Sequence, residues 1–261
     1  MSEVRSCGTV PATTIQNGEI SISAKDLGAV PMQDFCPRCF WIKLRLKQRK
    51  SELPFQIFPG IFSSIDSYTK SIVHGWFDKY HSAPRWMQKL EPIKDCVRKL
   101  PTYREYKFFD SEHGIWLQGS PDGVLVRPDN SYIIVDYKTA RYTEAQDRLY
   151  PMYATQLNVY ALIGMQTGMF PTVNGLALIY TEPLSDKEYA SNDLNHTDDG
   201  FKMGFAANIH HVGLDVGMIS GLLGKVREIH DMGVPPEGRG GCKDCESMNQ
   251  LIGLVLAAQQ L

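Results

Sequence analysis

The hydrophobic residues of the chain recur with two different periods. Between residues 61 and 80 they follow helical spacing, and prolines and a glycine come just before them, which predicts one long helix over about 61–80. Further along, short runs rich in β-branched and aromatic residues predict strands at about 104–109, 114–119, 122–127 and 131–137. The turn sequence RPDNS joins the last two of these strands.

The second half of the chain predicts helices around a further strand. Residues 143–168 indicate a helix with a break at Pro151, 173–183 a strand, and 210–233 another helix. A polar loop is expected at about 184–199. Strands flanked by long helices, without an internal repeat, favour a mixed α/β fold.

Composition and charge restrict the class of protein. A chain of 261 residues, 43% hydrophobic and 21% charged, can bury the core of a globular domain. The formal net charge is -2, so any contact with nucleic acid depends on a local basic patch. We see no membrane-spanning segment and no secretion signal, and we expect a soluble, cytoplasmic protein. The apolar stretch 251–261 predicts a helix docked on the core.

One candidate basic patch lies in residues 41–50, where lysines and arginines are interleaved with Trp41 and aliphatic residues. This mixture suits a surface that contacts phosphates, and it suits a solvated helix equally well. The solvated helix is the more common case.

Four of the six cysteines form two C-x2-C pairs near opposite ends of the chain: Cys36 with Cys39, and Cys242 with Cys245. Without a secretion signal, this spacing favours a shared metal site over disulfides. Four thiolates complete either a tetrahedral zinc site or an iron–sulfur cluster. Either would join the two ends of the chain.

The strand at 131–137 leads into charged residues. Strand alternation puts Asp136 and Lys138 on one face, with the Tyr137 side chain on the other. Asp122 lies across the preceding turn, so two adjacent strands can bring both carboxylates to one end of a sheet. Two carboxylates and a backbone carbonyl suit Mg²⁺ or Mn²⁺, and the lysine can then meet a water beside the ion.

These motifs resemble those of a known family. PD at 121–122 with DYK at 136–138 resembles the PD-(D/E)XK nuclease superfamily, and Gln156 with Tyr160 looks like the additional motif of its RecB-like branch. The cysteine pairs resemble the flanks of CRISPR-adaptation exonucleases of that branch, which hold a 4Fe-4S cluster. The resemblance covers about residues 30–250.

The resemblance implies a restriction-endonuclease-like α/β core, with a central mixed sheet flanked by helices, over residues 57–232. Residues 1–56 would form an N-terminal segment with the first cysteine pair, and 233–261 a C-terminal segment with the second pair and the docking helix. Together the two segments would form a cysteine-bound cap that joins the ends of the chain.

The implied function is a Mg²⁺- or Mn²⁺-dependent DNA exonuclease in repair, recombination or CRISPR adaptation. It would act on single-stranded DNA or a free end, with protein partners from the same pathway. Asp122, Asp136 and the Tyr137 carbonyl would hold the ion, and Lys138 would orient or activate the attacking water. The catalytic residues implied are Asp122, Asp136, Lys138, Gln156 and Tyr160.

The sequence departs from the family pattern in two places. The first core helix often carries a histidine near a glycine, whereas Ser63 or Ser64 stands there in this chain. Asp66 is then expected to supply the metal ligand, with His74 as an alternative. Without the histidine, a catalytically degenerate DNA-binding or scaffold module stays open.

The second departure concerns the cysteines, which divide two and two between the ends of the chain rather than one and three. The resemblance favours a 4Fe-4S cluster bound by these four residues. Zn²⁺ is the alternative, because the spacings suit it equally well.

Overall fold

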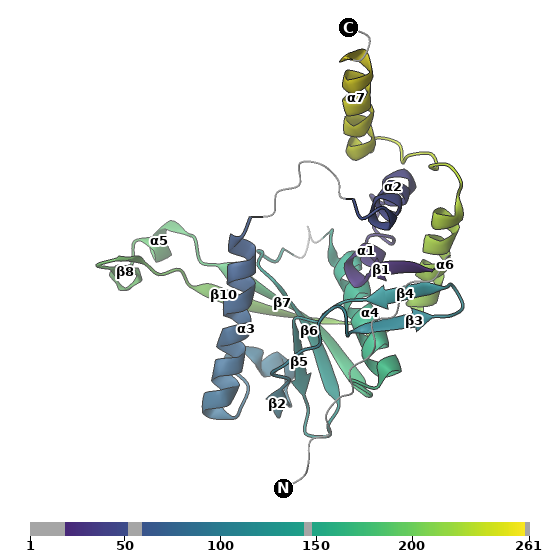
Figure 1. The fold of residues 1–261 in the computed structure, drawn as a ribbon. Coiled ribbons are helices and arrows are strands. Elements are labelled where there is room, and N and C mark those ends of the chain that lie inside the picture. The colour runs from purple at the N-terminus through teal and green to yellow at the C-terminus, as the bar shows by residue number, and fades with distance from the viewer. Residues whose placement is uncertain (1–18, 52–58, 144–147, 259–261) are drawn as a thin grey trace.

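The structure is a computed structural model that describes residues 19–51, 59–143 and 148–258. A five-stranded mixed sheet in the order β10-β7-β6-β5-β2 has helices packed against it (Figure 1). A smaller sheet in the order β1-β4-β3 lies beside it. The expected α/β fold, a central mixed sheet flanked by helices, is confirmed.

The elements have the following bounds. The strands of these two sheets are β1 (Ile20–Ser23), β2 (Asp95–Cys96), β3 (Lys107–Asp110), β4 (Ile115–Gln118), β5 (Gly123–Val126), β6 (Tyr132–Lys138), β7 (Val173–Pro183) and β10 (Phe205–Val212). The longer helices are α2 (Pro37–Gln48), α3 (Ile61–Tyr80), α4 (Tyr150–Thr167), α6 (Met218–Asp231) and α7 (Lys243–Ala258). The short elements are α1 (Ala24–Gly28), η1 (Arg85–Leu90), α5 (Lys187–Ala190), η2 (Asp193–Asn195), β8 (His196–Thr197) and β9 (Gly200–Phe201). None of the helices in the part of the chain that the structure describes is long and apolar enough to cross a membrane.

The strand β6 is buried because side chains cover both of its faces. It pairs antiparallel with β5 on one side and parallel with β7 on the other. Ile134 packs in the hydrophobic cluster that includes α4, whereas Ile133 and Val135 pack in the cluster that includes α3 and η1. Side chains alternate along a strand, so Asp136 lies on the α4 face with Ile134.

The residues before α3 contribute to the main core. Ser23 caps α1 by accepting a hydrogen bond from the backbone N–H of Asp26 at 3.1 Å, and Leu27 of this short helix is fully buried. Gly28 approaches α4 so closely that a Cβ there would lie 2.5 Å from the carbonyl oxygen of Met152. The N-terminal segment therefore supports the position of α4.

Several element boundaries differ from the sequence-based expectations. Residues 210–212 belong to β10, and α6 begins only at Met218. Pro151 lies in the first turn of α4, where the missing N–H is not needed, so it does not break the helix. The polar stretch 184–199 contains α5 and η2. Both α3 and β7 have the expected bounds.

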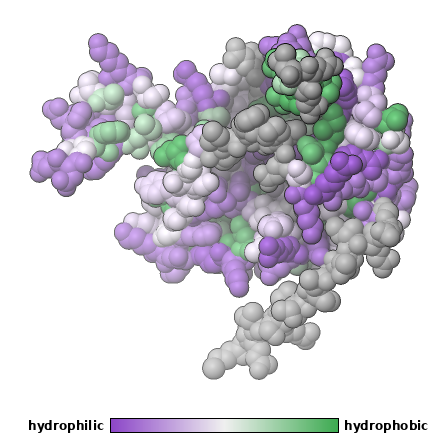
Figure 2. Space-filling view, turned by 45° about the horizontal axis from the view of Figure 1, so that its top comes forward, coloured by the Kyte–Doolittle hydropathy of each residue, from purple (hydrophilic) through white to green (hydrophobic). Residues whose placement is uncertain are grey.

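The expected docking of the C-terminal helix on the core is wrong. The helix α7 projects away from the two sheets (Figure 1), and hydrophobic residues gather on its surface (Figure 2). Leu254 is 71% exposed, whereas Cys245 in the first turn is buried. Asn249 accepts a hydrogen bond from Arg38 of α2 at 3.0 Å. An apolar sequence favours burial only where a facing surface exists, and the core provides none beside residues 251–258.

The helix α1 is joined to α2 through one carboxylate, and this contact makes stability depend on pH. Burial raises the pKa of Asp26, but the ammonium groups of Lys47 and Lys43, 2.7 Å and 2.6 Å away, lower it by more than burial raises it. The resulting pKa is about 2. The folded-state pKa is thus below the ordinary value. The resulting stabilisation is complete above about pH 4 and is lost as the pH falls toward 2.

We expect Asp26→Asn to lower the free energy of unfolding at pH 7 by about 1 to 2 kcal/mol, allowing for the exposure of both lysines. Urea denaturation between pH 7 and pH 3 measures this difference, which should narrow below about pH 4. The exposed Asp198 provides a control, since Asp198→Asn should show no such trend. A difference between Asp26→Asn and the unaltered protein that stayed constant with pH would contradict the prediction.

Candidate active site and cysteine site

Asp122 and Asp136 meet at one end of the central sheet. Gly123 of β5 pairs with Val135 of β6 in the antiparallel register, so the residue before Gly123 faces the residue after Val135. The backbone N–H of Tyr137 donates to Asp122 Oδ2 at 3.1 Å. The structure thereby brings together two carboxylates that lie fourteen positions apart in the sequence.

Lys138 lies on the same face of β6 as Asp136, as the alternation of the strand requires. Its ammonium group contacts Oδ2 of Asp136 and lies 4.2 Å from the centroid of the Tyr153 ring. The Tyr137 side chain lies on the opposite face, buried in the cluster with α3. The strand end therefore presents a carboxylate and an ammonium side by side.

Asp136 has a strongly perturbed pKa. Its side chain is almost fully buried, and the loss of hydration raises the pKa to about 7. The charge of Lys138 lowers the pKa, whereas repulsion from Asp122 raises it further. A negative charge at Asp136 is therefore costly unless cations lie close to it, which is the electrostatic environment of a cation-binding site.

Gln156 and Tyr160 of α4 lie directly beside Asp136. Gln156 Nε2 donates to Asp136 Oδ1 at 3.3 Å and to the hydroxyl oxygen of Tyr160 at 2.8 Å. The Tyr160 ring fits because residue 119 is glycine, where a Cβ would lie only 2.3 Å from Cε1 of the ring. These two residues, four positions apart on α4, restrict the orientation of the Asp136 carboxylate.

Lys70 is a site residue that the sequence analysis missed. Its Nζ donates to Asp66 Oδ2 at 2.8 Å and to Asp122 Oδ1 at 2.9 Å, so it bridges α3 and the start of β5. The available signal was the spacing of four positions between Asp66 and Lys70, which places both on one face of a helix. That spacing is common on solvated helices and does not reveal the contact with Asp122.

The other residues of α3 that the sequence singled out are Ser63, Ser64 and His74, and none of them has a hydrogen bond to Asp122 or Asp136 among the described contacts. Ser63 lines the same pocket as Asp66, whereas the Ser64 hydroxyl donates to the backbone carbonyl of Gly60 at 3.4 Å. His74 lies two turns beyond Asp66 and is not among the described residues that line the pocket. Burial, followed by the charge of a nearby arginine, lowers the pKa of His74.

A pocket of about 630 Å³ opens at this end of the sheet. Asp66, Asp122 and Asp136 line it together with Lys138 and the apolar side chain of Met152. Carboxylate oxygens are the donors that Mg²⁺ and Mn²⁺ prefer in proteins, so this set of residues fits such an ion.

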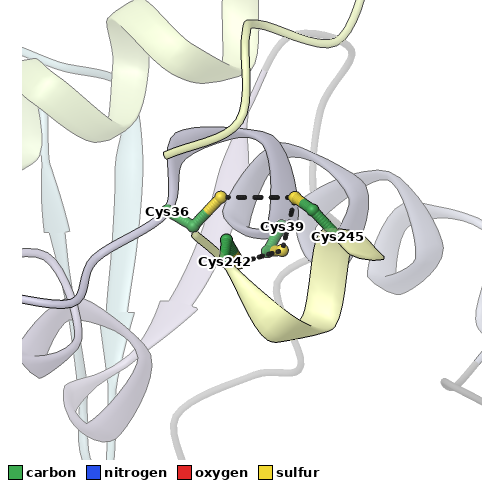
Figure 3. A group of neighbouring side chains, drawn as sticks. All are labelled: Cys36, Cys39, Cys242 and Cys245. Carbon is green, nitrogen blue, oxygen red and sulfur yellow. Dashed lines mark hydrogen bonds between the residues drawn. The ribbon is translucent and has the colours of Figure 1, made fainter. Parts of the chain in front are cut away.

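The two cysteine pairs also come together, although the contacting residues lie 203 to 209 positions apart (Figure 3). Cys36 and Cys39 lie at the start of α2, and Cys242 and Cys245 at the start of α7. All four sulfur atoms lie within 4.8 Å of one another. This arrangement is consistent with a cysteine-bound metal ion or cluster.

The surroundings of Cys36 favour the thiolate that metal binding requires. Burial raises the pKa of this thiol, but hydrogen bonds from the backbone N–H groups of Cys39 and Arg239 and from the neighbouring thiols together outweigh burial and lower the pKa to about 6. The Arg239 N–H donates to the Cys36 sulfur at 3.4 Å. The lowered pKa favours the thiolate, the form that ligates metals.

The basic residues of α2 have structural roles. Lys43 and Lys47 form ion pairs with Asp26, and Arg45 donates to the backbone carbonyl of His230 at 2.9 Å. These contacts agree with a helix held against its neighbours and do not require a bound phosphate.

Two solved structures align over most of the chain. The structure of SSO0001 shares 15% identity and a TM-score of 0.41, over 84% of this chain and 80% of that chain. An alkaline exonuclease, LHK-Exo, from Laribacter hongkongensis shares 10% identity and a TM-score of 0.41, over 80% of this chain and 85% of that chain.

The search of curated proteins gives no significant match. The model of one protein family, the PD-(D/E)XK nuclease superfamily, matches residues 56–250 and so covers well over half of the chain. The chain therefore belongs to the PD-(D/E)XK nuclease superfamily.

Proposed function

We propose that this protein is a metal-dependent nuclease that hydrolyses phosphodiester bonds in DNA. The observation that supports this most strongly is the meeting of Asp122, Asp136 and Lys138 at the end of a sheet, inside a pocket. Two carboxylates offer ligands for a divalent cation, and an adjacent ammonium can position a water molecule. Membership of a nuclease superfamily agrees with this chemistry.

Each residue of the proposed site has a distinct role. Asp122 and Asp136, with the backbone carbonyl of Tyr137, would hold Mg²⁺ or Mn²⁺. Such an ion, when bound, stabilises the charge that develops on the phosphate and lowers the pKa of its water. Lys138 orients the attacking water from its position beside Asp136. Gln156 keeps the Asp136 carboxylate facing the pocket through the 3.3 Å hydrogen bond.

The pair of Gln156 and Tyr160 supports a finer proposal, that the protein is an exonuclease of the RecB-like branch. Gln156 donates to both the Tyr160 hydroxyl and the Asp136 carboxylate, which links the motif to Asp136 and gives it a physical role at the site. We infer that the substrate is single-stranded DNA or a free DNA end. The corresponding biological setting is repair, recombination or CRISPR adaptation, with protein partners from the same process.

End-labelled single- and double-stranded DNA, incubated with Mg²⁺ or Mn²⁺, provides the test of the proposed function. We expect cleavage by the unaltered protein and a loss of at least about a hundredfold in Asp136→Asn, because the variant lacks a charged ligand for the ion. Release of single nucleotides from one end would also reveal exonuclease action and its polarity.

Asp129 provides a matched control in the same hairpin. It lies in the turn between β5 and β6, where its side chain accepts hydrogen bonds from Ser131. Asp129→Asn keeps the accepting oxygen and should retain full cleavage. If the folded protein binds DNA and the metal ion but does not cleave, the proposal is wrong and the degenerate binding module replaces it.

The distances between the cysteine sulfurs support a proposal about the second site. A tetrahedral ion with metal–sulfur bonds of about 2.3 Å holds its sulfurs about 3.8 Å apart. Three of the six sulfur–sulfur distances are 3.5 Å for Cys36 to Cys245, 3.7 Å for Cys39 to Cys242 and 3.4 Å for Cys39 to Cys245, and all four sulfurs lie within 4.8 Å of one another. We therefore propose a single Zn²⁺ at the four cysteines, with the 4Fe-4S cluster implied by the resemblance as the competing occupant.

Elemental analysis of protein purified without oxygen separates the two occupants. We expect about one zinc per chain and a colourless sample, whereas brown protein with iron and sulfide would establish the cluster instead. Because the site joins α2 to α7, Cys39→Ser should release the metal and lower the melting temperature. Cys96→Ser is the control, since Cys96 lies outside this group of cysteines and should leave the metal content unchanged.

A further inference from the structure

Lys70 occupies a position that the proposed catalytic roles do not explain. It is half-buried, and its ammonium group lies between Asp66 on its own helix and Asp122 at the start of β5. Both nitrogen–oxygen distances are below 3 Å. The lysine is thus a cation placed against a carboxylate that is a proposed metal ligand.

The hydrogen bonds of Asp122 leave no oxygen of that carboxylate unused. Oδ1 accepts from Lys70, and Oδ2 accepts from the backbone N–H of Tyr137. The backbone donor belongs to a buried strand and cannot withdraw without shifting the sheet. The Lys70 side chain can rotate, and Asp66 gives it a second acceptor when it leaves Asp122. A divalent ion that binds Asp122 therefore displaces the lysine most readily.

We propose that Lys70 is a resident counter-cation that a divalent ion must displace from Asp122, and that Asp66 receives the displaced ammonium group instead of binding the ion. This inference rests on the proposed function, because it assumes that Asp122 is a metal ligand. It makes Lys70 a positioning residue that sets the metal affinity of the site. Asp66 acts through Lys70.

Two physical consequences follow from a resident counter-cation. In the metal-free protein the ammonium offsets repulsion between Asp66 and Asp122, so its removal should destabilise that state. In the metal-bound protein the ammonium repels the ion and competes with it, so its removal should strengthen metal binding. A lysine that served only to join α3 to the sheet would give the first effect without the second.

The test is a calorimetric titration of Mn²⁺ into the full-length protein with its cysteine site loaded. For Lys70→Met we expect binding about tenfold tighter than in the unaltered protein, together with a lower melting temperature before Mn²⁺ is added. Arg98→Met is the matched control, because Arg98 also bridges an aspartate of α3, Asp78, and one of the sheet, Asp95, at 2.8 Å and 2.9 Å. It should lower stability and leave Mn²⁺ affinity unchanged.

The role of Asp66 is tested by combining two substitutions. Asp66→Asn alone should weaken Mn²⁺ binding, because Lys70 loses the negative charge that attracts it away from Asp122 and stays on Asp122. If Asp66 acts through Lys70, the double variant Asp66→Asn with Lys70→Met should match Lys70→Met within about threefold. A double variant much weaker than Lys70→Met would instead show that Asp66 binds the ion, and would overturn this part of the inference.

The outcomes separate this inference from the proposed function. Mn²⁺ binding that is lost in Asp136→Asn supports the metal site itself. If Asp136→Asn abolishes binding but Lys70→Met binds Mn²⁺ no more tightly than the unaltered protein, the proposed role of Lys70 is wrong. The proposed metal site is then still supported. If the unaltered protein shows no binding that depends on Asp136, the proposed metal site fails and the inference fails with it.

Discussion

The antiparallel pairing of β5 with β6 is the constraint on which the candidate active site depends. It places Asp122 against Asp136 at the end of a strand that is buried on both faces. Two carboxylates in such a place repel one another and lose hydration, and the raised pKa of Asp136 is the direct result. The fold compensates with ammonium groups from two separate elements, Lys138 on β6 and Lys70 on α3.

The two faces of β6 contact different helices. Val135 and Tyr137 pack toward α3, in the same cluster as Val73 and Phe77 of that helix. This packing fixes the C-terminal half of α3 on the sheet and leaves its N-terminal half beside the strand end, where Lys70 reaches the carboxylates. The other face of β6 lies against α4, which supplies Gln156. A single buried strand thus positions site residues from helices on both sides of the sheet.

The parts of the fold that could be predicted are those determined by local patterns. Continuous helical spacing gave the bounds of α3, and an apolar run between turn residues gave those of β7. The start of β10 at Phe205 was missed because buried and exposed residues do not alternate regularly along this strand, so it lacks the pattern by which a strand is predicted. The exposure of α7 was missed for a different reason. An apolar sequence indicates that a helix tends to be buried, but it does not indicate whether the rest of the protein offers a surface to cover it.

The same distinction applies to the site residues. Asp122, Asp136 and Lys138 could be placed together because one hairpin contains all of them, and a hairpin is a local structure. The contact of Lys70 with Asp122 joins residues 52 positions apart, and its formation depends on how α3 packs against the sheet. No periodicity in the sequence encodes that packing.

The cysteine site and the active site are connected by a continuous series of contacts. Cys36 and Cys39 lie at the start of α2, which binds Asp26 of α1 through two lysines. The helix α1 in turn packs on α4 at Gly28, one turn before Gln156. A metal ion bound at the cysteines would close a loop of about two hundred residues. Closing such a loop costs the unfolded chain conformational entropy, so the bound ion would favour the folded state. Its binding would therefore stabilise, through α2 and α1, the helix whose Gln156 donates to Asp136.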